Sequence, residues 1–316
     1  MIDWKDSEVL VIGGTGSLGT EIIRQLILMY QPKGVRIFSR DEFKQYQMRQ
    51  QIKAQRVAWL IGDVRDYERL YLAMHNVDIV INCAAMKQVP ACEDNPLEAV
   101  KTNVHGAENI VMAALENKVR LVMHISTDKA VYPVNLYGAT KAVAEKIFLH
   151  GNVYSGRLPT KFSICRYGNV IGSRGSVIPF FKELAGKNLP LPITDTRATR
   201  FWIHLSDVAK FIINCAAITK GKQIFIPHMP SMNILDLALA IAPESIIQET
   251  GLRFGEKLHE CLITQEEMNS VDVDYDGKVF TIDPEHYYPK LIGHEEPYTS
   301  ETNSWKLSVD DLRELI

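Results

Sequence analysis

The stretch VLVIGGTGSLG, residues 9–19, decides the fold of this chain. Four apolar residues run into a glycine-rich segment and an amphipathic run follows over residues 20–30, which predicts a buried strand, a tight turn and a helix. Gly13, Gly16 and Gly19 have the spacing of a dinucleotide-binding turn, whose glycines turn the chain, admit the pyrophosphate to the backbone and let the helix pack closely. The N-terminus of the helix would then present N–H groups to the phosphates.

Strands and helices alternate over residues 1–170. The apolar runs predict strands at Glu8–Ile12, Val35–Ser39, Arg56–Ile61, Asp78–Asn82, Arg120–Ser126 and Lys161–Arg166, with helix-length segments near 17–30, 41–53, 66–75, 96–117 and 136–150. Continuous apolar strands joined by helices are typical of a parallel sheet that is covered on both faces. We therefore predict an α/β fold with a doubly wound parallel Rossmann sheet, and residues 1–170 as its dinucleotide-binding domain.

The pattern becomes irregular after Gly168, where glycines and prolines interrupt it. The elements predicted beyond this point are a helix near 206–219, a strand at Gln223–Pro227 and a helix near 233–241. Residues 266–305 show no clear period. We expect residues 171–316 to form mainly a smaller C-terminal substrate domain, with segments at about 200–228 returning to the Rossmann domain.

The composition is that of a globular protein and gives no electrostatic sign of a polyanionic partner. The chain is 46% hydrophobic and 23% charged with a formal net charge of −3, so we expect neither nucleic acid nor an anionic membrane to bind it. The charged N-terminus is unlike a signal peptide, and no apolar run approaches the ~18 residues of a membrane helix, so we expect a cytoplasmic protein. Five cysteines without a paired or His-rich spacing predict free thiols and no metal site.

A cluster of reactive side chains follows the fifth predicted strand. Ser126-Thr127-Asp128-Lys129 places two hydroxyls, a carboxylate and an amine at the carboxyl end of that strand, where ligands bind in this fold. Tyr137 and Lys141 are four residues apart and share one face of the next helix. An ammonium one turn away favours the phenolate, so that Tyr137 can act as a base on a sugar or alcohol hydroxyl. A Tyr-x-x-x-Lys spacing alone is also typical of a half-buried tyrosine beside a solvated lysine, and the assignment depends on the glycine-rich turn upstream.

The end of the second predicted strand bears on which dinucleotide binds. Its first charged residue is Arg40, whose fork of donors suits the 2′-phosphate of NADP, and Ser39 and Lys44 add further donors. Asp41 offers the carboxylate that would select NAD, so NADP is favoured and NAD stays open. Asp63-Val64 follow the third strand, where a carboxylate can take the adenine amino group, although Asp63 can equally cap the next helix. The cofactor-binding set predicted in this way is Gly13, Thr15, Gly16, Ser17, Leu18, Gly19, Ser39, Arg40, Asp41, Lys44, Asp63, Val64, Ala84, Tyr137 and Lys141.

With its glycine-rich turn, Ser/Thr pair and Tyr-x-x-x-Lys couple, the chain resembles the extended short-chain dehydrogenase/reductases. Within that group it is similar to the inverting UDP-N-acetylglucosamine 4,6-dehydratases of pseudaminic acid biosynthesis. The blocks that carry this resemblance are GGTGSLG at 13–19, SRDEFKQ at 39–45, AAMKQVPACEDNP at 84–96, STDKAVYPVNLYGATK at 126–141, RYGNVIGSRGSVIPFF at 166–181, TRFWI at 199–203, PSMNILDLA at 230–238 and GEKLHE at 255–260. Asp128-Lys129 stands where dehydratases of dTDP- or GDP-sugars typically carry Asp-Glu. The resemblance extends to about residue 265, and the blocks that carry it do not include the tail 266–316.

The resemblance implies a dehydration without net oxidation. Tyr137, activated by Lys141, would take the proton of the hydroxyl on sugar carbon 4 while hydride passes to NADP. Lys129, held neutral by burial or nearby positive charge, would take the proton on carbon 5, and a protonated Asp128 would give its proton to the departing hydroxyl on carbon 6. Return of hydride to carbon 6 and of a proton to the opposite face of carbon 5 would give a UDP-4-keto-6-deoxy-L-arabino-HexNAc. Thr127 would hold Tyr137 or a sugar hydroxyl by a hydrogen bond.

The remaining site residues follow from the resemblance, and each has a simpler alternative. Lys87 is expected to reach the sugar or the nicotinamide ribose, and its alternative is a surface charge. The alternative for Asp128-Lys129 is a solvated ion pair, which is the common state of an Asp-Lys pair. The positions that contact UDP or the cofactor in the family correspond to Asn169, Arg174, Arg200, Arg253 and Glu256. Arginine forks suit a pyrophosphate, although each can also form a structural ion pair.

The resemblance also implies the partners and leaves alternative functions open. The expected partner is a UDP-sugar, and similar enzymes are usually homo-oligomers. The alternative function is a retaining 4,6-dehydratase or a 4-epimerase of another nucleotide sugar. A nucleotide-sensing protein without catalysis is a further class, but such proteins tend to lose a member of the Tyr-Lys-Ser/Thr set, which is complete here.

Overall fold

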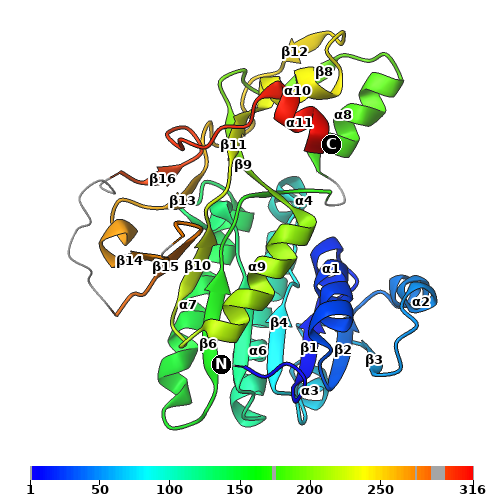
Figure 1. Ribbon diagram of the computed structural model, residues 1–316, viewed down its shortest axis with the longest axis vertical. Coiled ribbons are helices and arrows are strands. Elements are labelled where there is room, and N and C mark those ends of the chain that lie inside the picture. The colour runs from blue at the N-terminus through cyan, green and yellow to red at the C-terminus, as the bar shows by residue number, and fades with distance from the viewer. Residues whose placement is uncertain (1, 173–175, 275, 286–295, 316) are drawn as a thin grey trace.

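The computed structural model describes residues 2–172, 176–274, 276–285 and 296–315 of the chain. The strands of its large sheet are β1 (Glu8–Ile12), β2 (Gly34–Ser39), β3 (Val57–Ile61), β4 (Ile79–Asn82), β5 (Leu121–Ile125), β6 (Lys161–Cys165), β10 (Ile224–Pro227), β14 (Val271–Val273) and β15 (Val279–Ile282). They are arranged in the order β14-β15-β10-β6-β5-β4-β1-β2-β3 (Figure 1). All neighbours from β3 to β10 are parallel, and β15 and β14 extend the sheet in antiparallel fashion.

Helices cover both faces of this sheet. They are α1 (Ser17–Gln25), α2 (Glu42–Gln51), α3 (Tyr67–Ala73), α5 (Pro96–Val100), α6 (Gly106–Glu116), α7 (Leu136–Ser155) and α9 (Leu205–Ile218). α1 and α9 pack together on one face, and α3, α6 and α7 follow one another on the opposite face (Figure 1). The predicted doubly wound parallel sheet is therefore confirmed. π-helical turns at Leu26–Tyr30 and Lys101–His105 prolong α1 and join α5 to α6, which accounts for the long helical segments predicted there.

The burial of the strands explains their apolar sequences. All residues of β4 and β5 are buried, as are the last four residues of β1. Strands that are covered on both faces need such continuous apolar runs. β3 lies at the edge of the sheet, and each of its residues is partly or fully exposed.

A smaller lobe lies above the carboxyl ends of the parallel strands in Figure 1. It contains α8 (Val177–Gly186), α10 (Ile234–Ile241), α11 (Val309–Leu315) and a parallel pair of strands, β8 (Leu191–Ile193) and β12 (Ile247–Glu249). Its apolar clusters, around Trp202 and Phe181, are separate from the core of the large sheet. A three-stranded sheet of β7 (Asn169–Ile171), β9 (Thr199–His204) and β11 (Ser231–Asn233) lies between the lobe and the large sheet.

Several segments that gave no periodic signal have defined places in the structure. β14 and β15, from the stretch 266–305, pair beside β10, and β13 (Cys261–Ile263) pairs with β16 (Tyr298–Thr299). The short helix α4 (Val89–Asp94) follows β4. Within the segment 200–228, α9 and β10 contact the large sheet, whereas β9 belongs to the three-stranded sheet.

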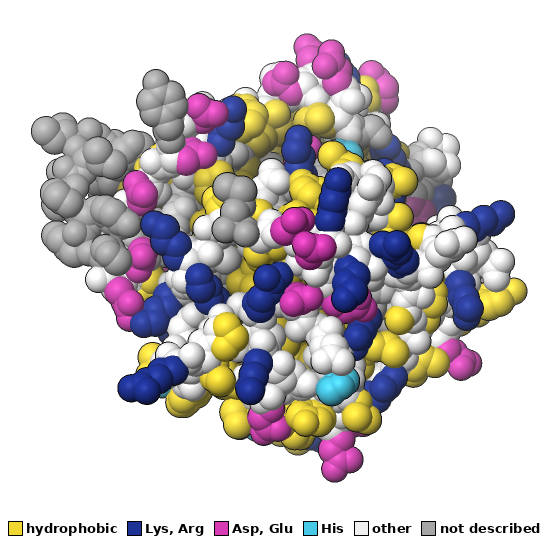
Figure 2. All heavy atoms as spheres, turned by 60° about the horizontal axis from the view of Figure 1, so that its bottom comes forward, with side chains coloured by type: hydrophobic (Ala, Val, Ile, Leu, Met, Phe, Trp, Pro, Cys, Tyr) yellow, Lys and Arg dark blue, Asp and Glu magenta, His cyan; other side chains and the backbone are white. Residues whose placement is uncertain are grey.

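The surface carries charges of both signs. Figure 2 shows the face at the bottom of Figure 1, where Lys and Arg side chains are scattered among Asp and Glu side chains. Within the described ranges, no helix is both long and apolar enough to cross a membrane. The same residues contain no group of three or more His, Cys, Asp or Glu side chains placed to hold a metal ion.

Candidate active site

The glycine-rich turn opens into a pocket of about 290 Å³ at the carboxyl end of β1. The predicted cofactor residues that line it are Gly13, Thr15, Gly16, Ser39, Arg40, Asp41, Lys44, Val64 and Ala84. Six further residues line the pocket and were not predicted: Ile12, Phe38, Gly62, Cys83, Ala85 and Thr102. Phe38 and Gly62 reach the pocket because β2 pairs with β1 and β3 pairs with β2 in the sheet, an order that no local motif encodes.

Glycine is required at two positions of the turn. Gly13 has a φ of +75°, and a Cβ there would lie 2.8 Å from the backbone N of Ala84. A Cβ at Gly19 would lie 2.6 Å from the carbonyl O of Gly13. Side chains are thus kept away from the backbone in front of α1, whose first turn contains Ser17 and Leu18. This bare backbone at a helix N-terminus fits the pyrophosphate of a dinucleotide.

The carboxylate of Asp41 is already occupied at the rim of the pocket. It accepts the backbone N–H of Lys44, which caps α2, and pairs with Lys44 Nζ at 2.7 Å. The neighbouring Arg40 side chain is 62% exposed and so retains donors for a ligand. Of these two candidates for the ribose, Arg40 is therefore the more available.

Asp63 is held by arginines rather than by the helix that follows it. Its carboxylate lies 2.7 Å from Arg65 and 3.7 Å from Arg40. The residue that caps α3 is Asp66, whose side chain accepts the N–H of Arg69. The alternative role of Asp63 as the helix cap is wrong.

The residues that follow β5 form a buried cluster. Thr127 caps a 3₁₀ turn, Asp128–Ala130, and thereby turns Asp128 inward, where it is fully buried. Asp128 Oδ1 accepts hydrogen bonds from Thr127 Oγ1 at 2.9 Å and from Lys129 Nζ at 3.0 Å. Among the described residues, Asp128 Oδ2 has no hydrogen-bond partner. One oxygen of the carboxyl group is therefore anchored, while the other is buried without a hydrogen-bond partner.

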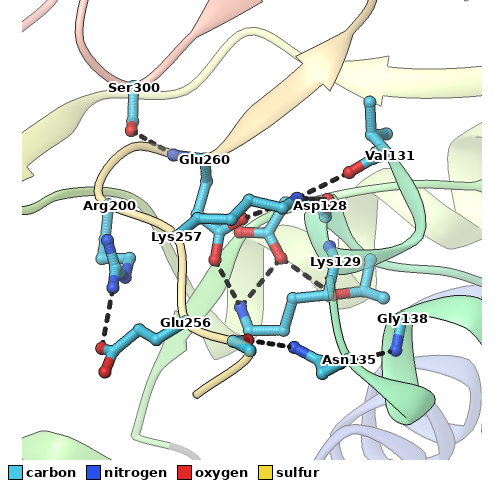
Figure 3. A network of polar contacts seen from close by, with 12 residues as sticks. Asp128, Lys129, Val131, Asn135, Gly138, Arg200, Glu256, Lys257, Glu260 and Ser300 are labelled. Atoms are coloured by element: carbon cyan, nitrogen blue, oxygen red, sulfur yellow. Dashed lines mark hydrogen bonds and ion pairs between the residues drawn. The ribbon is translucent and has the colours of Figure 1, made fainter. Parts of the chain in front are cut away.

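A second buried carboxylate, Glu260, faces this cluster from the segment before β13 (Figure 3). Lys129 Nζ lies 3.2 Å from its Oε1, and Lys257 Nζ lies 3.3 Å from its Oε2. In the sequence Glu260 is only the last letter of GEKLHE, and no role was predicted for it. The one available signal was a lone carboxylate directly before the apolar run Cys261–Ile263.

Asp128 and Glu260 are buried side by side but differ in their affinity for protons. Burial raises the pKa of Asp128, Lys129 opposes this shift and Glu260 adds to it, and the net change is upward. Burial would also raise the pKa of Glu260, but Lys129, Lys257 and Arg200 outweigh it and the net change is downward. When the pKa values of two neighbouring carboxyl groups are shifted in opposite directions, the group with the higher pKa is the proton donor and the other is the anion. Asp128 is suited to give a proton, and Glu260 to balance the positive charge.

Lys129 can act as a base only as a neutral amine, and its surroundings do not meet this condition. Burial lowers the pKa of Lys129, but the carboxylates of Asp128 and Glu260 outweigh burial and raise the pKa above its usual range. Lys129 is therefore an ammonium. It becomes a base only after its proton has passed to a neighbouring carboxylate.

α7 brings Tyr137 and Lys141 together on one buried face, as their spacing predicts. Burial raises the pKa of Tyr137 to about 12, and Lys129 and a hydrogen bond with Thr127 partly oppose this shift. Lys141 Nζ is instead bound to the carbonyl O of Ile125 at 2.6 Å. The expected lowering of the Tyr137 pKa by Lys141 is therefore wrong here, since the nearby lysine that lowers it is Lys129.

Three of the predicted sugar-nucleotide residues meet at the edge of this cluster. Glu256 accepts from Arg200 Nη2 at 3.1 Å (Figure 3). It also accepts from Arg253 Nε at 3.3 Å. Arg200 is buried on β9, whereas Arg253 is exposed. Asn169 begins β7, and Lys87 is exposed in the loop between β4 and α4. Arg174 lies outside the described residues.

Gly138, in the first turn of α7, sets the distance between the helix and the cluster. A Cβ at this position would collide with the backbone carbonyl O of Lys129. We expect Gly138→Ala to displace the turn that carries Asp128 and Lys129 and to lower kcat by about 10²-fold, with little change in dinucleotide affinity. Gly186→Ala is the matched control, because a Cβ at that position of α8 meets nothing within 4 Å. Wild-type turnover by the Gly138→Ala protein would contradict this role of Gly138.

Residues 9–282 match the family described as polysaccharide biosynthesis protein. The chain is 46% identical over 297 residues, 92% of this chain and 86% of the relative, to a protein of Campylobacter jejuni subsp. jejuni serotype O:23/36 named UDP-N-acetylglucosamine 4,6-dehydratase (inverting). A protein of C. jejuni serotype O:2 with the same name is 50% identical over 82% of this chain and 78% of its own length. A Rickettsia bellii protein named UDP-glucose 4-epimerase is 38% identical over 98% of this chain and 95% of its own length.

Solved structures agree with these matches. The X-ray structure of Pen from Bacillus thuringiensis superimposes with a TM-score of 0.91 at 37% identity, over 99% of each chain. DesIV of Streptomyces venezuelae, a dTDP-glucose 4,6-dehydratase, shares the fold with a TM-score of 0.72 at 22% identity, over 79% of this chain and 86% of its own. The resemblance read from the sequence blocks is thereby confirmed, and the chain belongs to the family of polysaccharide biosynthesis proteins.

Proposed function

We propose that the protein is a UDP-N-acetylglucosamine 4,6-dehydratase that inverts sugar carbon 5. The observation that carries the proposal is the buried cluster of Asp128, Lys129 and Glu260 beside Tyr137. A 4,6-dehydratase needs a base at carbon 4, a base at carbon 5 and an acid at carbon 6, and this cluster offers groups for all three. The names of the Campylobacter relatives support the same substrate.

The pocket beside the glycine-rich turn would hold the cofactor, which we propose to be NADP rather than NAD. A bound nicotinamide would accept hydride from sugar carbon 4 and return it to carbon 6. Arg40 is exposed at the pocket and suits a 2′-phosphate, whereas the Asp41 carboxylate, which would bind the ribose of NAD, is engaged with Lys44. Tyr137 and Lys141 would bind the nicotinamide end.

The chain's own groups then act on three positions of the sugar. Tyr137, held by Thr127, would release its own phenol proton, for which Lys141 on the same face of α7 is the proposed acceptor, and would then take the proton of the carbon 4 hydroxyl. Asp128, whose pKa burial raises, would give a proton from Oδ2 to the hydroxyl that leaves carbon 6. Lys129 would first pass its proton to Asp128, 3.0 Å away, which turns the ion pair into a neutral acid and a neutral base, and would then take the proton from carbon 5.

The experiment that tests this function is incubation of the purified protein with UDP-N-acetylglucosamine and NADP in deuterium oxide, followed by NMR and mass spectrometry. We expect loss of one water, deuterium on carbon 5 and the couplings of the L-arabino configuration. Loss of water with carbon 5 retained would keep the reaction class and exclude the inversion. If this sugar nucleotide is unchanged while others react, the proposed substrate is wrong.

A 4-epimerase is the second candidate, because the Rickettsia relatives that carry this name match almost the whole chain. Epimerisation at carbon 4 needs the Tyr137 couple but no acid and base for carbons 5 and 6. An epimerised product of unchanged mass would favour this candidate, and it would leave the Asp128 and Lys129 cluster without a chemical role.

Arg40 is the residue that should distinguish the two dinucleotides. We expect Arg40→Ala to weaken NADP binding by about 10–10²-fold, the effect of losing charge-assisted hydrogen bonds, while NAD binding changes little. Calorimetric titration with both cofactors measures this preference. Arg65→Ala is the control, because Arg65 shares the Asp63 partner but does not line the pocket. An equal loss of affinity for both dinucleotides would show that Arg40 does not read the 2′-phosphate.

Further features of the resemblance remain predictions. They are a cytoplasmic location, a homo-oligomeric state and the use of the product in pseudaminic acid or a related glycan. We also propose that Lys87, Asn169, Arg174, Arg200, Arg253 and Glu256 bind the UDP-sugar.

A further inference from the structure

His124 on β5 is a buried titratable residue that the proposed mechanism does not use. The residue is 2% exposed, and its ring stacks on Phe148 of α7 with the ring centroids 4.1 Å apart. Both ring nitrogens have polar neighbours: Nδ1 lies 3.0 Å from Asn82 Nδ2, and Nε2 lies 2.9 Å from Lys141 Nζ. His124 therefore connects the end of β4 to the catalytic helix α7.

The Asn82 amide determines which ring nitrogen carries the hydrogen. Asn82 Oδ1 accepts the backbone N–H of Ala84 at 3.1 Å, and its Nδ2 group consequently faces the ring. Because an amide NH₂ group only donates, His124 Nδ1 must accept. Burial, with Lys141 adding to it, lowers the pKa of His124 well below its usual value, so the ring is neutral. Its single hydrogen is then on Nε2 and points at Lys141.

This hydrogen is compatible with only one protonation state of Lys141. An ammonium has three donors and no acceptor, so it would face the Nε2–H group donor to donor. A neutral amine accepts this hydrogen and still donates to the carbonyl O of Ile125. We propose that His124, oriented by Asn82, is a positioning residue that donates its Nε2–H to Lys141 and holds this lysine as a neutral amine in the free enzyme. The inference deepens the proposed function, since it concerns the partner of Tyr137.

The other groups that face Lys141 bring its neutral amine within reach just above neutral pH. Burial lowers the pKa of Lys141 to about 8, and Glu145 and Cys83 oppose this shift. The Glu145 carboxylate is engaged by the Arg166 guanidinium through hydrogen bonds of 3.0 and 2.7 Å. Burial raises the pKa of Cys83 to about 12, so its thiol is neutral. Among the residues that the structure describes, the carboxylate that acts on Lys141 is that of Glu145, and it already has the Arg166 guanidinium as its cationic partner.

The bond has a defined effect on the pH dependence of the reaction. A hydrogen bond donated to the neutral amine favours that form and lowers the pKa of Lys141, so loss of the bond raises it. A neutral Lys141 can take up the proton that Tyr137 releases, whereas an ammonium cannot. Activity should then fall as the pH drops through the pKa of Lys141. Loss of the His124 bond should move this acidic limb to higher pH by about one unit.

The tautomer can be measured without turnover. In protein labelled with ¹⁵N-histidine and saturated with NADP, the His124 signals are assigned by their absence from the His124→Asn spectrum. We expect the hydrogen on Nε2 and no conversion to imidazolium in the neutral pH range. A hydrogen on Nδ1, or a ring that protonates in this range, would overturn the inference whether or not the protein is a dehydratase.

Three variants then connect the tautomer to catalysis. His124→Gln keeps a side-chain donor at the reach of Nε2, whereas His124→Asn reaches only Asn82. Asn82→Asp places a carboxylate beside Nδ1, which moves the hydrogen to Nδ1 and lets Nε2 accept from a Lys141 ammonium. We expect the acidic limb of the kcat profile to move upward in His124→Asn and Asn82→Asp and to stay in place in His124→Gln. If the variants lose thermal stability or kcat but the acidic limb lies at the same pH in all three, His124 is only a packing residue and the inference is wrong.

Discussion

Replacement of Asp128 by asparagine is expected to lower the rate of water elimination by about 10²–10⁴-fold, the usual contribution of a general acid. Asparagine keeps the shape of the side chain and an oxygen that can accept from Thr127 and Lys129, as Asp128 Oδ1 does. It cannot transfer the proton that Asp128 would carry on Oδ2. Oxidation at carbon 4 does not use this proton, so hydride is removed from the sugar but not returned. Rapid mixing should therefore show reduced nicotinamide that persists, and mass spectrometry a sugar that has not lost water.

The pH dependence provides a second measurement on the same variant. Because the pKa of Asp128 is raised, the acid form is present at low pH and is lost as the pH rises through that pKa. This loss gives the wild-type enzyme a basic limb that Asp128→Asn should lack. Asp78→Asn is the control, since Asp78 is also paired with a cation, Arg120, but precedes β4 at the opposite end of the sheet. Wild-type elimination by Asp128→Asn would mean that another group protonates the leaving hydroxyl.

Replacement of Tyr137 by phenylalanine is expected to lower kcat by a similar factor, about 10²–10⁴-fold, but at an earlier step. The buried phenol of Tyr137 is the proposed base at carbon 4, and its hydrogen bond with Thr127 orients it. Without it, the carbon 4 hydroxyl keeps its proton and the sugar is not oxidised. We therefore expect no reduced nicotinamide on rapid mixing, in contrast to the Asp128→Asn protein.

A buried tyrosine can also be lost at the expense of stability, so a matched variant is needed. Tyr167 is buried in the core near Tyr137, and Tyr167→Phe removes a hydroxyl without removing the proposed base. Thermal unfolding and NADP affinity should be similar in the two variants, whereas only Tyr137→Phe should lose hydride transfer. Equal losses of turnover would assign the effect to packing, and rapid reduction of nicotinamide by Tyr137→Phe would exclude Tyr137 as the base.

The large sheet could be predicted because its signals are local. A strand buried on both faces needs an unbroken apolar run, and the bend after β1 needs glycine at Gly13, so both leave marks within a few residues. β14 and β15 leave no such mark. They contain three and four residues and are stabilised by pairing with β10 and with each other. A strand this short has too few alternations to show a period.

The catalytic residues could be named from the sequence, but their protonation states could not. Thr127, Asp128, Lys129 and Tyr137 lie within one motif, where their spacing predicts a common site. The base role of Lys129 requires a neutral amine, and the structure instead places the distant carboxylate of Glu260 beside it. A charge acts through space according to distance and burial, and separation along the chain does not enter.

By itself, then, the sequence determined the Rossmann sheet, the dinucleotide turn and the identity of the Asp-Lys and Tyr-x-x-x-Lys groups, because apolar period, glycine spacing and residue type are local properties. Only the tertiary structure decided which of these groups hold protons. The raised pKa of Asp128, the raised pKa of Lys129 and the lowered pKa of Lys141 beside His124 each depend on burial and on partners from other strands and loops. Those partners meet only when the chain is folded.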